Sequence, residues 1–341
     1  MRSKLKIGKK KLDKLSLKGY ISRRAFDSGF LLIITVIFNF VLFRIMPGNP
    51  ALAVLGRTGQ VRPEFRQVLQ ERYGTNLPIF DQFIIYIQRL LEGDLGVSFY
   101  YYPTEVSELI FGHRLLNTIL LMGISILLSF VLAIIFGTIA ASKFKSKTDL
   151  VSIFVTLTSY STPVFWLGML IIFYFFGQFH LIPLSGSPRI EDPKYADIFA
   201  WAIDYGYHLI GPVTTLTISF VGAWFLIARD QMLGIFLEDY ITTARAKGLK
   251  ERRVLFTHAR KNAMLPMISV LAMAMTYLVS GATLTETVFS WDGLGLLTFD
   301  AVTYSDYPLL QGLFLLVAAV AIVSSFIADI IYAYLDPRIR Y

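Results

Sequence analysis

The sequence predicts an all-helical integral membrane protein with about six transmembrane helices. Hydrophobic residues make up 55% of its 341 residues, charged residues make up only 16%, and the mean hydropathy is +0.58. A typical soluble domain has about 45–50% apolar and about 25% charged residues. The apolar residues also occur in long runs, which suit helices that cross the roughly 30 Å hydrocarbon core of a bilayer. A soluble enzyme with a large core would interleave apolar and polar residues, so we set that class aside.

Six apolar runs are long enough to cross the membrane, because a spanning helix needs about 20 mostly apolar residues. They cover residues 26–46, 115–141, 150–177, 209–229, 264–289 and 309–335. The first run is longer than the core of a usual signal peptide, and no Ala-x-Ala-like site follows it, so we interpret it as a retained anchor. The segment 47–113 predicts a small extracytoplasmic insertion, with apolar residues at helical spacing in 64–73 and 79–92.

The distribution of Lys and Arg predicts the orientation of these helices. The net charge is +8, and the basic residues gather in four segments that fall on one side of the predicted membrane. These segments are 1–25, 142–149, 230–263 and 336–341. Cytoplasmic loops carry an excess of Lys and Arg, so both termini are expected in the cytoplasm, with the protein in the plasma (inner) membrane. The basic balance then reflects topology and contact with lipid, and we expect no nucleic-acid partner.

Several chemistries lack the residues that they need. There is no cysteine, which excludes disulfides, Cys-ligated zinc, iron–sulfur clusters and cysteine nucleophiles. The four histidines are scattered without i, i+4 pairs, so no metal site and no catalytic site is predicted. No G-x-x-x-x-G-K-[ST] phosphate loop is present, so the chain is not expected to hydrolyse ATP. A secondary carrier or channel would carry charged relays within its spans, and a membrane-embedded enzyme would carry clustered His, Asp or Ser and Lys; neither pattern is found.

The loop 230–263 is too long for a simple turn between two spans. It holds helix-forming residues up to Gly248, which is a good helix stop, and then charged residues that begin a second helix. Two short helices joined at a glycine would lie at the membrane interface. Such an element either docks into a groove on a partner and transmits motion, or lies on lipid headgroups through Arg and Lys. The residues alone leave both interpretations open.

The same loop contains A-R-A-K-G at 244–248 and H-A-R-K-N-A-M-L-P at 258–266. Further motifs are M-P-G-N-P at 46–50, G-D-L-G-V-S at 93–98, T-P-V-F-W at 162–166, E-T-V-F-S-W at 286–291 and L-D-P-R at 335–338. In their order, from about residue 26 to the end, these motifs resemble the permease subunits of ABC importers. They are most similar to the peptide/nickel branch, in its oligopeptide and dipeptide permease B-type subunits. The chain departs from that pattern at Thr242, where the family has a glutamate, and at Asn49, where it has an acid.

The resemblance implies the transmembrane domain of a type I ABC importer. It implies a basic tail (1–25), a first helix (26–46), an insertion (47–113), a permease core (114–335) with a coupling loop at about 235–265, and a cytoplasmic C-terminus (336–341). The expected partners are a second homologous permease, two ABC ATPases that bind ATP and Mg, and an extracytoplasmic substrate-binding protein. The cargo would be short peptides, oligosaccharides or nickel, moved by alternating access. The residues expected to dock the ATPase are Thr243, Ala244, Arg245, Ala246, Lys247, Gly248 and Leu249.

Candidate residues for the translocation path are less sharply defined. They are polar or helix-breaking residues in the third and fifth runs, namely Ser161, Pro163, Thr276, Ser280, Thr283 and Glu286. Pro163 lacks a backbone N–H and predicts a kink near mid-membrane. The small polar residues suit a wet cavity, but helix–helix packing is the favoured interpretation, because such residues are common where membrane helices pack. Glu286 is expected to act either as a gate or in a structural pair.

Overall fold

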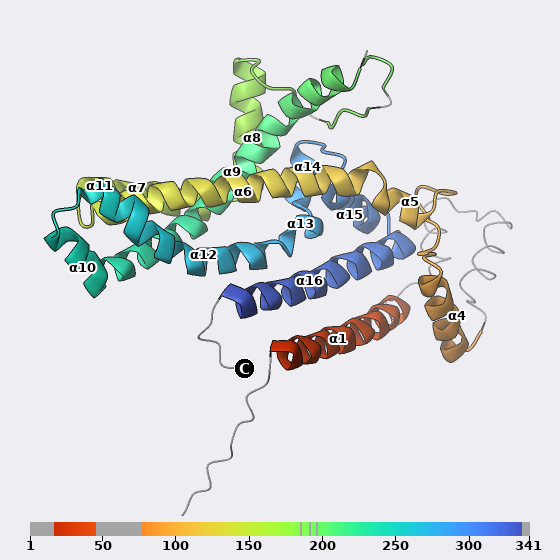
Figure 1. The fold of residues 1–341 in the computed structure, drawn as a ribbon. Helices are drawn as coiled ribbons and strands as arrows, with labels where there is room; N and C mark the ends of the chain where they lie inside the picture. Colours follow the sequence, from red (N-terminus) through yellow and green to blue (C-terminus); the bar gives the residue numbers. More distant parts are fainter. Residues whose placement is uncertain (1–16, 46–76, 185, 191, 196, 336–341) are drawn as a thin grey trace, which may run out of the picture.

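The computed structural model describes residues 17–45, 77–184, 186–190, 192–195 and 197–335 (Figure 1). This part of the chain is helical, with one isolated β-bridge between Val97 and Glu105. The helices are α1 (Leu17–Ile45), α4 (Ile79–Leu91), α5 (Val106–Phe111), α6 (His113–Ser142), α7 (Lys147–Ser161), α8 (Val164–Ile171), the π-helical turn η1 (Ile172–Gln178), α9 (Ile198–Phe236), α10 (Asp239–Ala246), α11 (Glu251–Arg253), the π-helical turn η2 (Val254–Ala259), α12 (Arg260–Ala274), α13 (Tyr277–Ser280), α14 (Thr283–Val288), α15 (Leu294–Thr303) and α16 (Tyr307–Leu335).

Four helical segments in the described residues are long and apolar enough to cross a membrane. They are Gly19–Arg44, Val106–Ser142, Ile198–Phe236 and Tyr307–Ile331. They match the first, second, fourth and sixth predicted spans, although the fourth extends well beyond the predicted 209–229. A fifth candidate is the bent pair Lys147–Ser161 and Val164–Gln178. The predicted helix at 79–92 is confirmed as α4, whereas the one at 64–73 lies outside the described residues.

The third predicted span is broken rather than gently kinked. Its two halves meet at an angle of 98° at Thr162 and Pro163. Thr162 is extended, with φ −77° and ψ 128°, as expected for a residue that precedes proline. We call residues 161–164 the elbow. Because α7 ends there and α8 starts again after Pro163, the chain turns almost at a right angle within one predicted span.

The fifth predicted span, 264–289, also differs from the prediction, because it is not one continuous helix. Helix α12 ends at Ala274, and the short helices α13 and α14 follow. Gly281 separates these two with φ +73°, a left-handed conformation that ends a helix. A Cβ at Gly281 would lie 2.8 Å from the backbone nitrogen of Gly295, so α15 packs directly against the break. Contact with a distant segment therefore accounts for the interruption, and hydropathy alone does not reveal it.

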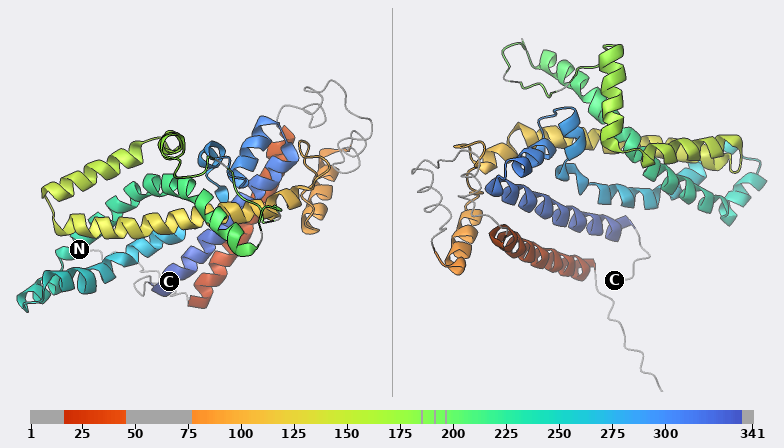
Figure 2. Two further views of the ribbon diagram at one scale, coloured as in Figure 1. Left: turned by 90° about the horizontal axis from the view of Figure 1, so that it is seen from above. Right: turned by 180° about the vertical axis from the view of Figure 1, so that it is seen from behind.

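The helices form an elongated bundle around α6 and α9 (Figure 1). Helices α4 and α5 lie at one end of the bundle, and α10 and α11 lie at the other. Helices α1 and α16 run side by side, and α8 with the first part of α9 projects from the body (Figure 2). The main apolar core joins α6 to α9 through buried residues that include Leu121, Phe130 and Phe225. Gly137 allows the closest approach, since a Cβ there would lie 2.9 Å from that of Ala228.

Candidate functional site

The predicted coupling loop packs on the bundle through one apolar face of α10. Ile241 and Ala244 are buried, and both belong to a cluster formed by the ends of several helices. That cluster also holds Ala141 of α6, Met232 of α9, Val254 and Ala259 of η2, and Ala263 of α12. The buried face of α10 therefore packs directly against the ends of α6 and α9.

Gly248 ends α10 in the way that the sequence predicts. Its φ is +73°, its N–H donates to the carbonyl oxygen of Arg245 at 2.9 Å, and the N–H of Leu249 donates to that of Ala244 at 3.4 Å. This pair of hydrogen bonds is the Schellman arrangement, in which a left-handed residue closes a helix. No atom lies within 4 Å of a Cβ built on Gly248, so backbone conformation, not space, favours glycine. The predicted short helix that ends at this glycine is confirmed as α10. The predicted second helix begins at Glu251, but it is not short, because α11 continues without a break through η2 into α12.

The seven predicted docking residues divide between two faces of the loop. Thr243, Arg245, Ala246, Lys247 and Gly248 are exposed. Ala244 is buried, and Leu249 packs against the same apolar cluster, so these two hold the loop to the bundle. Arg245 is already engaged within the chain: its Nη2 donates to Oε1 of Glu251 at 2.7 Å. The exposed face therefore offers Lys247 and small side chains, flanked by an Arg–Glu pair.

The elbow borders a hollow of about 640 Å³. The residues that line it are Phe154, Leu157, Thr158, Ser161, Thr162, Pro163 and Trp166. The structure thus brings Ser161 and Pro163 together at one open surface. Thr276, Ser280 and Thr283 do not line this hollow; they lie half-buried at the ends of α13 and α14, and the Ser280 hydroxyl donates to the carbonyl oxygen of Tyr277.

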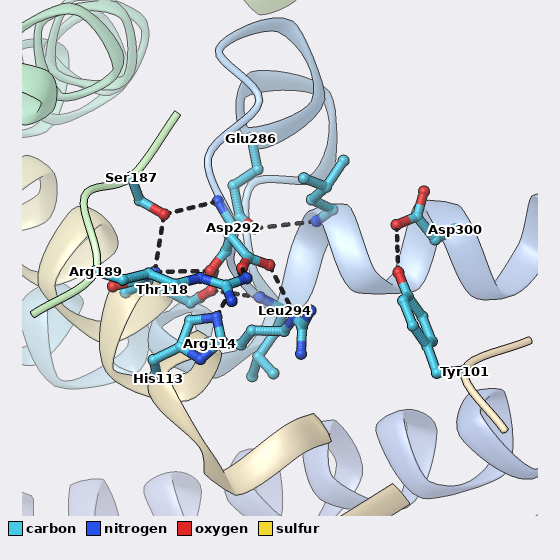
Figure 3. A network of polar contacts seen from close by, with 12 residues as sticks. Tyr101, His113, Arg114, Thr118, Ser187, Arg189, Glu286, Asp292, Leu294 and Asp300 are labelled. Atoms are coloured by element: carbon cyan, nitrogen blue, oxygen red, sulfur yellow. Dashed lines mark hydrogen bonds and ion pairs between the residues drawn. The ribbon is translucent and has the colours of Figure 1, made fainter. Parts of the chain in front are cut away.

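Glu286 is fully buried, and its carboxylate joins three segments (Figure 3). Oε1 accepts hydrogen bonds from Oγ1 of Thr118, at 3.2 Å, and from the N–H of Ala282, at 3.2 Å. Oε2 accepts from the N–H groups of Gly295, at 2.7 Å, and Leu296, at 3.0 Å. These two N–H groups belong to the first turn of α15, where a negative charge is favoured. Of the two predicted roles, this geometry favours the structural one.

Asp292 forms a second polar centre in the loop between α14 and α15 (Figure 3). Its carboxylate lies 2.6 Å from Nε2 of His113, 2.8 Å from Nε of Arg114 and 2.6 Å from Nη2 of Arg189. Burial opposes the ionisation of this carboxyl, but the three basic side chains outweigh it and hold the pKa of Asp292 below its ordinary value. Asp292 therefore ties the start of α6 and the segment before α9 to the α14–α15 loop.

In the sequence, Asp292 stands out only as one of several acids in an outer loop, and its partners are not evident. A second ion pair, between Asp149 and Arg229, is also not evident from the sequence. The sequence shows only that Arg229 is a basic residue at the end of an apolar run, and such a residue requires a partner when it is buried. A sequence alone does not say which acid supplies that partner.

Comparison with known proteins decides the family. Residues 133–341 match the family described as binding-protein-dependent transport system inner membrane component, and residues 17–105 match the N-terminal domain of such membrane components. The chain belongs to this family. The oligopeptide transport system permease protein AppB of Bacillus subtilis is 34% identical over 325 residues, which cover 95% of this chain and all of AppB. The dipeptide transport system permease protein DppB of Escherichia coli K12 is 34% identical over 320 residues, 89% of this chain and 93% of DppB.

The family assignment confirms the predicted resemblance and its main consequence. The protein is a multi-pass inner-membrane permease subunit of an ABC transporter, and the ATPase activity of this family resides in separate subunits. Among the described residues, no three His, Asp or Glu side chains lie close enough to hold a metal ion.

Proposed function

We propose that this permease forms half of the transmembrane pore of an importer for short peptides. The similarity to peptide permeases over almost the full length of both chains carries this proposal. The names of the relatives refer to oligopeptides, dipeptides, and di- and tripeptides. They give no support to the oligosaccharide or nickel alternatives. An extracytoplasmic binding protein would deliver the peptide to the outer end of the pore.

The pore requires a second, homologous permease beside this one. The elbow supports this, because a broken helix exposes backbone polar groups, and such groups are not tolerated against lipid in the hydrocarbon region. The hollow at the elbow would then face the partner or a water-filled path between the two subunits. The projecting α8 supports the same arrangement, since Phe165, Trp166 and Met169 are exposed on it. In this assembly the chain crosses the membrane six times, with the third and fifth crossings broken.

The end of the bundle that carries α10 would lie in the cytoplasm. The exposed Lys143, Lys147 and Lys250 lie at or near that end of the helices, as expected for cytoplasmic loops. Helix α1 begins, and α16 ends, on the same side of the bundle (Figure 1). Both termini are therefore proposed to be cytoplasmic.

Two ABC ATPases would dock on the exposed face of α10 and on the corresponding loop of the partner. These subunits would bind ATP and Mg, and closure of the ATPase pair would move α10 towards its counterpart. The buried side of α10 would pass this movement to α6 and α9, and so alternate the access of the pore. The exposed residues Thr243, Arg245, Ala246, Lys247 and Gly248 make up the docking surface in this mechanism.

The test is uptake of a labelled tripeptide into proteoliposomes that contain the whole complex and enclose ATP. We expect uptake that requires ATP, both permeases and the binding protein, and no uptake when the ATPases are omitted. A labelled trisaccharide serves as the matched control cargo and should not accumulate. Uptake of the tripeptide without ATPases, or driven by an ion gradient alone, would contradict the proposal and favour a secondary carrier.

A further inference from the structure

A buried ion pair connects the first turn of α7 to the last third of α9. Nε of Arg229 donates to Oδ1 of Asp149 at 2.7 Å, and Nη2 donates to Oδ2 at 2.9 Å. The Asp149 side chain is 2% exposed and the Arg229 side chain 12%. A two-pronged Arg–carboxylate contact fixes both distance and orientation, which a single hydrogen bond does not. The pair thus sets how α7 sits on α9.

The surroundings hold both partners in place. Oδ2 of Asp149 also accepts from the backbone N–H of Lys145 at 3.0 Å, and Ser146 caps α7 by accepting from the Asp149 N–H. The second Nη of Arg229 donates to the exposed Asp230 at 3.2 Å, and its guanidinium lies 5.6 Å from the ring of Phe144. The turn between α6 and α7 is therefore part of the same contact.

Two further contacts continue the α7–α9 interface from this pair up to the elbow. Gly222 of α9 faces α7 so closely that a Cβ would lie 2.5 Å from the carbonyl oxygen of Thr156. The Ser159 hydroxyl, about one helical turn further, donates to the carbonyl oxygen of Ile218. Helix α7 is thus attached to α9 at its start, middle and end, and the elbow begins directly after the last contact.

The predicted coupling loop packs against α9 on the other side of the Asp149–Arg229 pair. Met232, about one turn beyond Arg229 on α9, is buried against Ile241 and Ala244 of α10. Helices α9 and α10 are separated by only two residues, and α9 is continuous from Phe236 back past Arg229. The path from α10 to the elbow therefore runs through α9, and Asp149–Arg229 is the first polar contact at which α7 joins it.

We infer that Asp149 and Arg229 are a positioning pair that transmits movement of the coupling loop to the elbow. The inference rests on the proposed function, since it requires that a partner moves α10. With the pair intact, α7, α9 and α10 move together, and the elbow residues Ser161 and Pro163 are displaced with them. Without it, α10 and α9 still respond to the partner, but α7 follows through its remaining packing contacts, which include those at Gly222 and Ser159.

The first experiment measures peptide taken up per ATP hydrolysed, in proteoliposomes that contain the complete complex. Arg229→Gln removes the positive charge and the two-pronged contact with Asp149. We expect the uptake per ATP to fall about tenfold, while the rate of ATP hydrolysis stays within about twofold of that of the complex without substitutions. Arg229→Lys keeps the charge but loses the two-pronged geometry, so an intermediate loss is expected. The matched control is Arg89→Gln, which breaks the Arg89–Asp94 pair at the other end of the bundle and should leave the ratio unchanged.

A second measurement separates transmission from simple loss of stability. Spin labels on cysteines introduced at Lys147 and Gly234, both exposed, report the distance between the start of α7 and the end of α9. In an otherwise unaltered complex this distance should stay the same with and without ATP. In Arg229→Lys, which retains a buried charge pair and should assemble, the distance should broaden or shift when ATP is added.

Two results would overturn the inference. One is an unchanged ratio of uptake to ATP hydrolysis in Arg229→Gln. The other is a label distance that responds to ATP in the same way in Arg229→Lys and in the complex that keeps the native arginine. Failure of the proposed function is distinguishable from either result, because in that case the complex without substitutions would itself show no link between ATP hydrolysis and uptake.

Discussion

Glu286 of α14 and Gly295 of α15 are in direct contact: the glycine N–H donates to the carboxylate at 2.7 Å, and a Cβ on Gly295 would lie 2.9 Å from the same oxygen. The two residues hold the interrupted helices of the fifth predicted span against the start of α15. Gly293 is closer still, since a Cβ there would lie 2.5 Å from Oε2 of Glu286. A buried carboxylate and small residues around it therefore replace the continuous helix that hydropathy predicts.

Removal of the Glu286 carboxylate should destabilise the permease. Glu286→Ala leaves the N–H groups of Ala282, Gly295 and Leu296 without their buried acceptor, and an unsatisfied buried group costs about 1–3 kcal/mol. Glu286→Gln keeps one acceptor oxygen and should cost less. Thermal unfolding of the purified complex in detergent measures the difference, with the exposed Glu108→Ala as the control. Equal unfolding temperatures for Glu286→Ala and Glu108→Ala would contradict the structural role.

Gly295→Ala tests the close packing around the same carboxylate. The added Cβ would lie 2.8 Å from the backbone nitrogen of Thr283, so α14 and α15 must move apart. We expect a lower unfolding temperature and a weaker Glu286 contact. The control is Gly234→Ala, where no atom lies within 4 Å of the added Cβ and alanine favours the helix by about 1 kcal/mol. If both substitutions change stability in the same direction, the packing argument fails.

Gly248→Val should uncouple ATP hydrolysis from uptake. A β-branched residue is strained at φ +73°, so the end of α10 must change its conformation and the exposed face must move. Gly248→Asn should be much milder, because asparagine adopts left-handed conformations more readily. ATP hydrolysis and peptide uptake are measured together in proteoliposomes. Normal uptake per ATP in Gly248→Val would show that the shape of this turn is not needed for coupling.

The Asp292 centre predicts a loss of stability in acid. Its folded-state pKa lies below the ordinary 3.8, so its contribution is fully present above pH 3.8 and is lost as the pH falls through the lower folded-state pKa. Asp292→Asn removes the charge that pairs with Arg114 and Arg189, and should lower the unfolding temperature at neutral pH. The difference in unfolding temperature between Asp292→Asn and the protein with the native aspartate should become smaller as the pH falls below 3.8. A constant difference across this range would contradict the assignment.

Hydropathy and charge were sufficient to locate the helices that are long and apolar enough to cross a membrane. They set the start of α9 too late, because Asp204 and His208 make its first turns look like a loop. In the structure His208 bonds to the carbonyl oxygen of Asp204, and Asp204 pairs with Lys194, so these polar residues are accommodated within the helix or beside it. Local bonding of this kind allows a helix to extend beyond its apolar run.

The end of α10 at Gly248 was predictable, because a glycine stop and the residues before it act locally. The two acidic centres and the Asp149–Arg229 pair were not, because their partners lie far apart in the sequence. Arg229 is 80 positions from Asp149, and Asp292 is 179 positions from His113. Only the packing of α6, α7 and α9 brings such residues together, and no periodic pattern in one sequence encodes that packing.

The most direct test of the central claim is a cross-link between α10 and an ATPase subunit. Thr243 is exposed, and the chain has no native cysteine, so Thr243→Cys introduces a single reactive thiol. Leu91→Cys, at an exposed position at the other end of the bundle, is the control. We predict that a short thiol-reactive cross-linker joins the Thr243→Cys permease to an ATPase subunit and that the control forms no such product. An active complex in which Thr243→Cys forms no cross-link to an ATPase would contradict the claim that this loop is the docking site.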